Sequence, residues 1–227
     1  MIHLAVETST EVVDMSLLSE DKVLVRLSVF RPGGASEILV QGLETLLAMA
    51  GEKKESIALV SSSAGPGTYT SIRVGHLFCK GLAFATGCPH LVVSPFLVLA
   101  EQAWASGGRG EEFLVVLLDA RRREVNACLF DPSKPAAPVS GTGETFSGRA
   151  VPPERVLENL PPGKGRIVGP GVVHLEKMDL GREHPLLIHD LPGAGTMGRL
   201  AIRSWRAREE GDVPGSTLLY GRDSVIA

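Results

Sequence analysis

Short apolar runs alternate with polar turns over the first thirty residues. The runs cover residues 2–6, 12–18 and 22–30, and turn-forming polar residues separate them. Runs of this length at such close spacing predict strands of an antiparallel meander. The sequence Arg31-Pro-Gly-Gly then ends the strand pattern.

Apolar positions recur at helical spacing in the two stretches that follow. Ser36 suits an N-cap and Gly51 a C-terminal cap, which predicts a helix over 37–50. Gly87 closes a second helix over 71–86 in the same way. The other elements expected in this part are strands over 57–61 and 90–93 and a helix that starts at Pro95 and runs to about 105.

The glycine-rich segment 106–110 marks a boundary, and the order of strands before helices partly repeats beyond it. We therefore expect an α/β protein with a duplicated architecture, divided into halves 1–107 and 108–227. The elements expected in the second half are strands over 113–118, 124–130 and 166–168, an edge strand within 132–148, and helices over 153–159 and 196–210.

Composition narrows the class of protein. The 227 residues correspond to one large or two small domains, and 44% hydrophobic with 22% charged residues is ordinary for a soluble globular protein. A net charge of −3 gives no general attraction to nucleic acid, so an RNA contact would need a local basic patch or a basic partner. Three cysteines without a CxxC pair, a start unlike a leader peptide and the lack of a long apolar run predict a cytoplasmic protein.

The two helices of the first half carry more apolar surface than one core contact needs. On 37–50 the apolar arc spans about 200°, against about 100° for a single contact. On 71–86 the polar strip is narrow, and Gly75, Cys79 and Ala83 form a row of small residues that would let another helix approach closely. Two interpretations remain open: this chain buries both helices itself, or a second protein covers the surplus face.

The loop before the second helix, SSAGPGTYTSIRVG at 62–75, has the residues of an anion site. Gly65 and Gly67 permit unusual backbone angles, and Thr70 or Ser71 suits the helix cap. The N–H groups of Gly67 and Thr68 and of the helix start would then point at a common spot, with Arg73 one turn along. The spacing is not that of a P-loop, and a tight strand-to-helix turn, which we favour, explains the same residues.

Neither the glycine motif near the C-terminus nor the histidines indicate a cofactor. GAGTMG at 193–198 has the form GxGxxG, but too few residues follow its helix to supply the strand and acidic residue of a dinucleotide fold. The six histidines show no metal-ligand spacing, and no nucleophile–base pair is evident, so no metal site and no catalytic residue are proposed.

Two charged clusters favour structural roles. Asp119, Arg121 and Glu124 suggest a hairpin turn with an internal ion pair rather than catalysis. Arg199, Arg203 and Arg206 form a basic stripe on the last helix, for which a solvated face is favoured over a strip that contacts phosphates.

Six segments, among them SAGPGTYTSIRVG at 63–75 and LDARRREVNACLF at 118–130, together resemble the bacterial TsaB (YeaZ-like) family. The opening strand and turn resemble the start of the actin-like, sugar-kinase and heat-shock ATPase superfamily, and the loop 63–75 carries the most specific match. The matching segments, in the family's order, are LAVETST at 4–10, SAGPGTYTSIRVG at 63–75, KGLAFA at 80–85, VSPFLVLAEQA at 93–103, LDARRREVNACLF at 118–130 and LLYGR at 218–222.

The resemblance implies a fold and a role. The fold would be α/β, with two actin-like (ribonuclease-H-like) halves, mixed sheets flanked by helices, and a reduced second half. The role would be a non-catalytic binding subunit in making N6-threonylcarbamoyladenosine at position 37 of tRNA. Its partners would be a catalytic TsaD-like paralogue, a small TsaE-like ATPase and, in isolation, a second copy of itself, with tRNA reached only through the complex.

The resemblance also implies an interface and a place for a nucleotide. The chain alone would hold no cofactor, and ATP or ADP is expected at the partner interface, near Gly65, Gly67, Thr68, Thr70 and Arg73. The helices 37–50 and 71–86 would form a four-helix bundle with the paralogue or with a second copy. The interface residues expected on them are Ile38, Val40, Met49, Ile72, Gly75, His76, Cys79, Leu82 and Ala83.

Some positions depart from the family pattern. The two metal-ligating histidines of the paralogue align with Pro95 and Leu99, which cannot bind a metal. Glu7, Ala35 and Asn126 replace the usual aspartate, histidine and tyrosine, which weakens nucleotide binding by this chain alone. A stand-alone actin-like ATPase or small-molecule kinase, using Glu7 and the 65–70 loop, is the alternative hypothesis.

Overall fold

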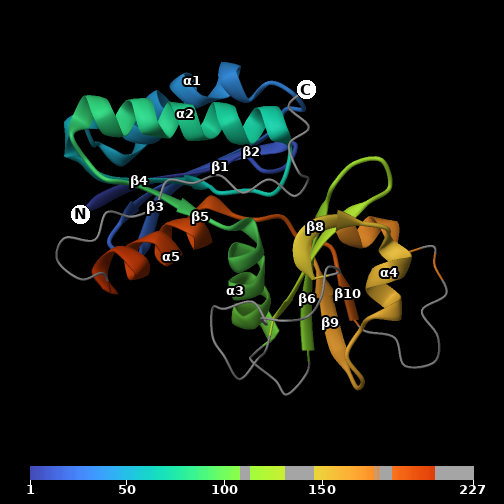
Figure 1. The fold of residues 1–227 in the computed structure, drawn as a ribbon. Helices are drawn as coiled ribbons and strands as arrows, with labels where there is room; N and C mark the ends of the chain where they lie inside the picture. Colours follow the sequence, from blue (N-terminus) through green and yellow to red (C-terminus); the bar gives the residue numbers. More distant parts are fainter. Residues whose placement is uncertain (108–112, 131–145, 177, 179–185, 208–227) are drawn as a thin grey trace. The chain divides into compact units, whose positions relative to one another are not determined.

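The computed structural model describes residues 1–107, 113–130, 146–176, 178 and 186–207. This part of the chain is α/β and contains two five-stranded mixed sheets (Figure 1). It forms two compact units, the first made of Met1–Pro95 with the last described helix and the second of Phe96–Leu191. The units differ from the predicted halves 1–107 and 108–227 because the last helix packs on the strands of the first unit.

The first sheet has the strand order β3-β2-β1-β4-β5. β1, β2 and β3 are antiparallel neighbours, whereas β4 and β5 run parallel to β1, so the predicted meander is confirmed. The strands are β1 (Ile2–Glu7), β2 (Val12–Ser19), β3 (Lys22–Phe30), β4 (Ile57–Ser63) and β5 (His90–Val93).

Helices cover both faces of this sheet (Figure 1). α1 (Ala35–Ala50) and α2 (Tyr69–Thr86) pack on one face, where Leu4 and Met15 reach their core. α5 (Ala194–Ala207) packs on the other face. Nearly every residue of β1 and β2 is buried, and successive strand residues point to opposite sides, so both faces of these strands are covered. A one-turn 3₁₀ helix, η1 (Lys54–Ser56), precedes β4.

The ends of α1 and α2 confirm the predicted C-terminal caps and correct the N-terminal ones. Gly51 and Gly87 have left-handed backbone angles, with φ of 69° and 71°. α1 begins at Ala35, so Ser36 lies inside the helix rather than at its cap. α2 begins at Tyr69, so neither Thr70 nor Ser71 caps it.

The second sheet has the order β10-β9-β6-β7-β8. Alternate residues of its central strands fill two cores: Leu114 and Phe130 belong to one with α3, and Val115 and Leu129 to the other with α4 and η2. The strands are β6 (Phe113–Asp119), β7 (Val125–Phe130), β8 (Ser147–Val151), β9 (Gly165–Val168) and β10 (Leu186–Ile188). The helices are α3 (Pro95–Gly107), α4 (Pro153–Glu158) and the 3₁₀ helix η2 (Pro170–His174).

Some predictions for the second half differ from the structure or lie outside it. β10 is a strand that the sequence pattern did not predict. The predicted edge strand within 132–148 overlaps β8 only at its end, and 131–145 lie outside the described residues. The LLYGR segment at 218–222 also lies outside them.

Candidate functional site

The exposed side of α2 carries a regular stripe of large residues. Tyr69, Arg73, Leu77, Lys80 and Phe84 are all exposed and follow one another at intervals of three or four residues. Residues at this spacing lie along one side of a helix, as the contact positions of packed helices do. We call these five residues the α2 stripe.

The apolar members of the α2 stripe are exposed to an unusual degree. Phe84 is 91% exposed and Leu77 65%, although both side chains are large and apolar. Arg73 places its guanidinium over the ring of Tyr69, 4.0 Å from the centroid. On the neighbouring helix α1, Val40 and Met49 are also exposed. These positions form an apolar surface of a kind that marks protein interaction sites.

The row of small residues on α2 lies on the opposite side of the helix, against the sheet. Gly75, Cys79 and Ala83 are buried. A side chain at Gly75 would place its Cβ 2.3 Å from Thr8 Oγ1. The Sγ of Cys79 lies 3.7 Å from the backbone oxygen of Ser61, and burial raises the pKa of this thiol. The row therefore seats α2 closely on β1 and β4 of its own chain.

The burial of this row corrects part of the predicted interface. Ile72, Gly75, His76, Cys79 and Ala83 face the core of this chain, so a partner cannot contact them in this fold. Ile38 and Leu82 are half-buried and pack against the same core. Val40 and Met49 are exposed, as the prediction requires. The prediction from helical spacing failed because small residues allow α2 to approach a sheet closely as well as another helix.

The predicted anion loop packs against the turn after β1. Thr68 N–H donates to the backbone oxygen of Ser9 at 2.7 Å. A side chain at Gly67 would place its Cβ 2.3 Å from that same oxygen, and Gly65 has a left-handed φ of 81°. These contacts fit the tight strand-to-helix turn. Thr70 is exposed at the start of α2, and Arg73 lies over Tyr69.

A buried carboxyl group lies next to this loop. Glu7 is fully buried, and its Oε1 accepts a hydrogen bond from Ser9 N–H at 2.5 Å. Burial raises the pKa of Glu7 to about 7, although the Ser9 hydrogen bonds oppose the shift. Asp14, also buried, raises it slightly further. This carboxyl therefore titrates around neutral pH inside the protein.

A serine between two histidines is a feature that the sequence search missed. Ser62 Oγ lies 2.8 Å from His90 Nε2 and 3.5 Å from His76 Nδ1, and the two rings are 4.9 Å apart. Burial lowers the pKa of both histidines, that of His90 to about 4, so they are neutral at pH 7. His76 and His90 lie 14 residues apart, so no short spacing motif could reveal them. In the described residues no three His, Cys, Asp or Glu side chains gather as a metal site would require.

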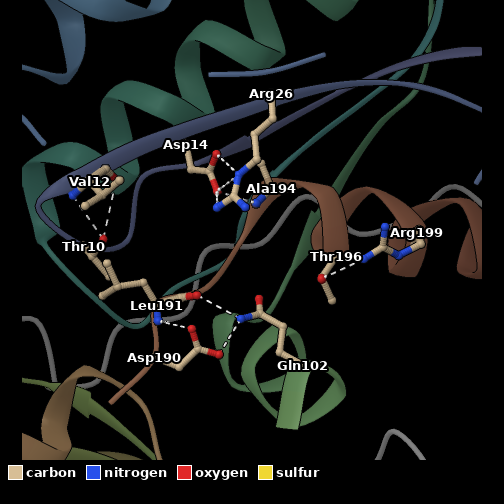
Figure 2. A network of polar contacts seen from close by, with 10 residues as sticks. All are labelled: Thr10, Val12, Asp14, Arg26, Gln102, Asp190, Leu191, Ala194, Thr196 and Arg199. Atoms are coloured by element: carbon tan, nitrogen blue, oxygen red, sulfur yellow. Dashed lines mark hydrogen bonds and ion pairs between the residues drawn. The ribbon is translucent and has the colours of Figure 1, made fainter. Parts of the chain in front are cut away.

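The N-terminus of α5, which begins within the GxGxxG motif at Ala194, is occupied by a carboxylate of the same unit. Figure 2 shows Asp14 between Arg26 and the first residue of α5. Asp14 Oδ2 accepts from Ala194 N–H at 3.1 Å and from Arg26 Nη2 at 2.6 Å. A buried carboxylate thus satisfies the helix end that a dinucleotide phosphate would otherwise approach.

The two charged clusters have partners within the chain. The turn from Asp119 to Glu124 joins β6 and β7, and Arg121 Nη1 lies 3.9 Å from Asp119 Oδ2, which confirms the predicted hairpin turn with an ion pair. On α5, Arg206 pairs with Glu20 and Asp21.

The other residues that depart from the family pattern take structural positions. Leu99 is fully buried on α3, and Asn126 donates from its side chain to the backbone oxygen of Gly148 at 3.0 Å. Ala35 is buried at the first turn of α1. None of the helices in the described part of the chain combines the length and apolar composition of a bilayer span.

Comparison with known proteins shows what this chain is similar to. A family model described as TsaD, tRNA N6-adenosine threonylcarbamoyltransferase, matches residues 34–134. The tRNA threonylcarbamoyladenosine biosynthesis protein TsaB of Escherichia coli (strain K12) is 25% identical over 227 residues, which cover 98% of this chain and 95% of that protein.

Solved structures agree with the sequence relatives. YeaZ from Pseudomonas aeruginosa superposes with a TM-score of 0.78 at 26% identity and covers 96% of this chain and 99% of its own. The inorganic polyphosphate/ATP-glucomannokinase from Arthrobacter sp. strain KM has a TM-score of 0.50 at 14% identity, covering 90% of this chain and 99% of its own, and is similar in fold alone. The predicted α/β class, with two mixed sheets flanked by helices, is confirmed.

Proposed function

We propose, from the premise that the chain is a relative of the TsaB (YeaZ-like) proteins, that it takes part in tRNA threonylcarbamoyladenosine biosynthesis as a non-catalytic binding subunit. The similarity to the Escherichia coli protein and to YeaZ of Pseudomonas aeruginosa extends over nearly the whole of each chain. In this proposal a TsaD-like paralogue transfers the threonylcarbamoyl group to adenosine 37, and this chain provides a docking surface for it.

The α2 stripe is the observation that carries the proposal. Leu77 and Phe84 are exposed at helical spacing, with Lys80 between them, and α1 runs beside α2 on the same face of the sheet (Figure 1). Burying a large apolar side chain at an interface stabilises a complex by about 1.5–3 kcal/mol. A paralogue that presents two similar helices would complete a four-helix bundle over this surface.

The absence of catalysis by this chain is part of the proposal. Pro95 and Leu99 occupy the positions aligned with the metal-ligating histidines of the paralogue, and Leu99 is buried in a core. The alternative, a stand-alone ATPase or kinase, would need Glu7 as a carboxylate near a metal-bound phosphate. That carboxyl is buried, accepts from Ser9 and is only partly ionised at neutral pH, which weighs against the alternative.

The central experiment measures assembly and product together. The full chain and its TsaD-like paralogue are mixed, and size-exclusion chromatography with light scattering reports whether they co-elute. Depletion of this chain in its own cells should lower threonylcarbamoyladenosine in hydrolysed tRNA, measured by mass spectrometry. A paralogue that elutes alone, or an unchanged nucleoside level after depletion, would refute the proposal.

The other partners in this proposal are a second copy of the chain, a TsaE-like ATPase and a nucleotide. In isolation the apolar stripe should pair with a second copy of itself, and the paralogue should displace that copy because both use the same residues. A TsaE-like ATPase would join the assembled pair, and ATP or ADP would bind near residues 65–73 only when the paralogue is present. Calorimetry with ATP on the chain alone and on the pair separates this from the alternative, which requires tight magnesium-dependent binding by the chain alone.

A further inference from the structure

The hairpin turn between β6 and β7 has an unusual backbone. Arg121, Arg122 and Arg123 have φ angles of 65°, 54° and 63°, so three consecutive residues are left-handed. Left-handed positions favour glycine or asparagine, because other side chains crowd the backbone there. All three residues are arginines with exposed side chains. The turn thus keeps three guanidinium groups where a glycine would form the bend more readily.

Hydrogen bonds fix the backbone of this turn, which we call the arginine turn (Arg121–Arg123). Asp119 Oδ1 accepts from Arg121 N–H at 2.8 Å and lies 3.1 Å from His174 Nε2. Ala120 N–H donates to the Glu124 backbone oxygen at 2.9 Å, which closes the hairpin. The strands on either side are almost entirely buried. The backbone that carries the three side chains is therefore fixed before a ligand arrives, so binding costs less backbone entropy.

The chemistry of the arginine turn favours phosphate as a ligand. Arginine presents a planar fork of N–H donors that matches two phosphate oxygens, and it remains charged at every physiological pH. Arg121 is paired with Asp119, and the neighbouring Arg122 and Arg123 are exposed, so the turn offers positive charge that a ligand with several anionic groups would neutralise.

We propose that the arginine turn binds the phosphodiester backbone of a nucleic acid. A nucleic-acid strand offers singly charged phosphates at regular intervals, whereas one small anion would engage fewer of the three guanidinium groups. The identification of that strand as tRNA rests on the proposed function. The turn then gives this chain a direct contact with the substrate of the complex, in place of the contact through the complex alone that the resemblance implied.

Salt-dependent binding tests the arginine turn. The full chain, alone and with its TsaD-like paralogue, is titrated against labelled tRNA by fluorescence anisotropy between about 50 and 200 mM salt. The variant Arg122→Asn/Arg123→Asn removes two charges but keeps residues that accept left-handed angles. It should weaken binding roughly tenfold at the lowest salt and reduce the slope of log K against log salt by about 2, since each phosphate contact contributes about 0.9.

Matched variants make the outcome specific. Lys53→Asn/Lys54→Asn removes the same charge from two exposed residues elsewhere and should leave the slope unchanged. Arg122→Lys/Arg123→Lys should restore most of the slope but only part of the affinity, because lysine keeps the charge and loses the fork. An unchanged slope in the asparagine variant, or no measurable tRNA binding by the unmodified protein in either form, would overturn the inference.

Two further measurements identify what would have failed. Polyglutamate that binds the unmodified protein as tightly as tRNA does would reassign the turn to an acidic protein and overturn its assignment to a nucleic acid. The asparagine variant should still co-elute with the paralogue, since the arginine turn and the α2 stripe are separate in the chain. Loss of co-elution in the unmodified protein refutes the proposed function, whereas an unchanged salt slope refutes only the arginine turn.

Discussion

The two sides of α2 have opposite compositions and opposite burial. The side facing the sheet carries Gly75, Cys79 and Ala83, which are small and buried, whereas the solvent side carries Leu77 and Phe84, which are large and exposed. In a helix that served only its own fold, the large apolar residues would lie inside. The inner side has little room because the sheet lies close, and the proposed docking surface accounts for the large apolar residues on the outer side.

Loss of the outer apolar side chains should have the largest effect on assembly. Leu77→Asp/Phe84→Asp places two charges on the α2 stripe, and we expect binding to the TsaD-like paralogue to weaken by a factor of about 100 or more, since central interface residues contribute about 2 kcal/mol or more each. The free energy of unfolding should change by less than about 0.5 kcal/mol, because neither side chain is part of the core. Calorimetric titration and urea denaturation measure the two quantities.

Ala85→Asp is the matched control for that variant. It adds a charge to an exposed position on the same helix, outside the α2 stripe, and should leave binding nearly unchanged. Equal loss of binding in both variants would mean that general charge repulsion, and not the stripe, governs assembly.

The inner side of α2 packs on the end of β1, where the buried Glu7 predicts a pH effect. The folded-state pKa of Glu7 is raised from 4.5 to about 7, so the folded protein binds more protons than the unfolded chain across that interval. Its contribution to stability is therefore present at low pH and is lost as the pH rises through about 7. Glu7→Gln should gain about 2–3 kcal/mol in unfolding free energy relative to the unmodified protein between pH 5 and pH 8.

Comparing Glu7→Gln with the unmodified protein at each pH separates the effect of Glu7 on stability from the effects of His3 and His90. The pKa of His3 is lowered to about 3 and that of His90 to about 4 by burial, so both destabilise the fold as the pH falls below about 6.5. These effects are common to both proteins and cancel in the difference. A difference that stays constant from pH 5 to pH 8 would mean that Glu7 is ionised throughout.

Alanine substitutions at two glycines of α2 test how much room each side of the helix has for one added methyl group. Gly75→Ala should lower the unfolding free energy by about 1–2 kcal/mol, because the new Cβ would meet Thr8 Oγ1 at 2.3 Å. Gly81→Ala has open space around it and should raise the unfolding free energy by about 0.5–1 kcal/mol through its better helix propensity. Thermal or urea denaturation of the two variants checks the signs, and equal signs would contradict the assignment of the two sides.

The smallest effect expected concerns the cation at the start of the α2 stripe. Arg73→Gln removes the guanidinium over Tyr69 and should cost about 0.5 kcal/mol of stability, as exposed cation–π pairs do. A double-mutant cycle with Tyr69→Leu isolates the pair. A coupling energy near zero would mean that Arg73 is positioned by its other contacts.

Sequence periodicity located the secondary structure well and the sides of the helices poorly. The strand over 22–30 and the ends of α1 and α2 at Gly51 and Gly87 were predictable, because a two-residue period and a left-handed glycine are local features. Only three residues form β10, and its partner β9 lies about twenty residues earlier, so no local pattern could identify it. Ser62, His76 and His90 were missed for the same reason, because they meet only in the folded chain.

The amino-acid sequence by itself determined that the chain is α/β, that α1 and α2 carry surplus apolar surface, and that the segments 63–75 and 118–130 resemble one family. Only the tertiary structure decided which side of α2 is exposed, because the same spacing of small and apolar residues is expected for a helix that packs on a sheet and for one that packs on another helix. It also revealed that Asp14 occupies the N-terminus of α5 and that three arginines share a left-handed turn. These facts depend on contacts between residues far apart in the chain and on backbone angles that composition does not fix.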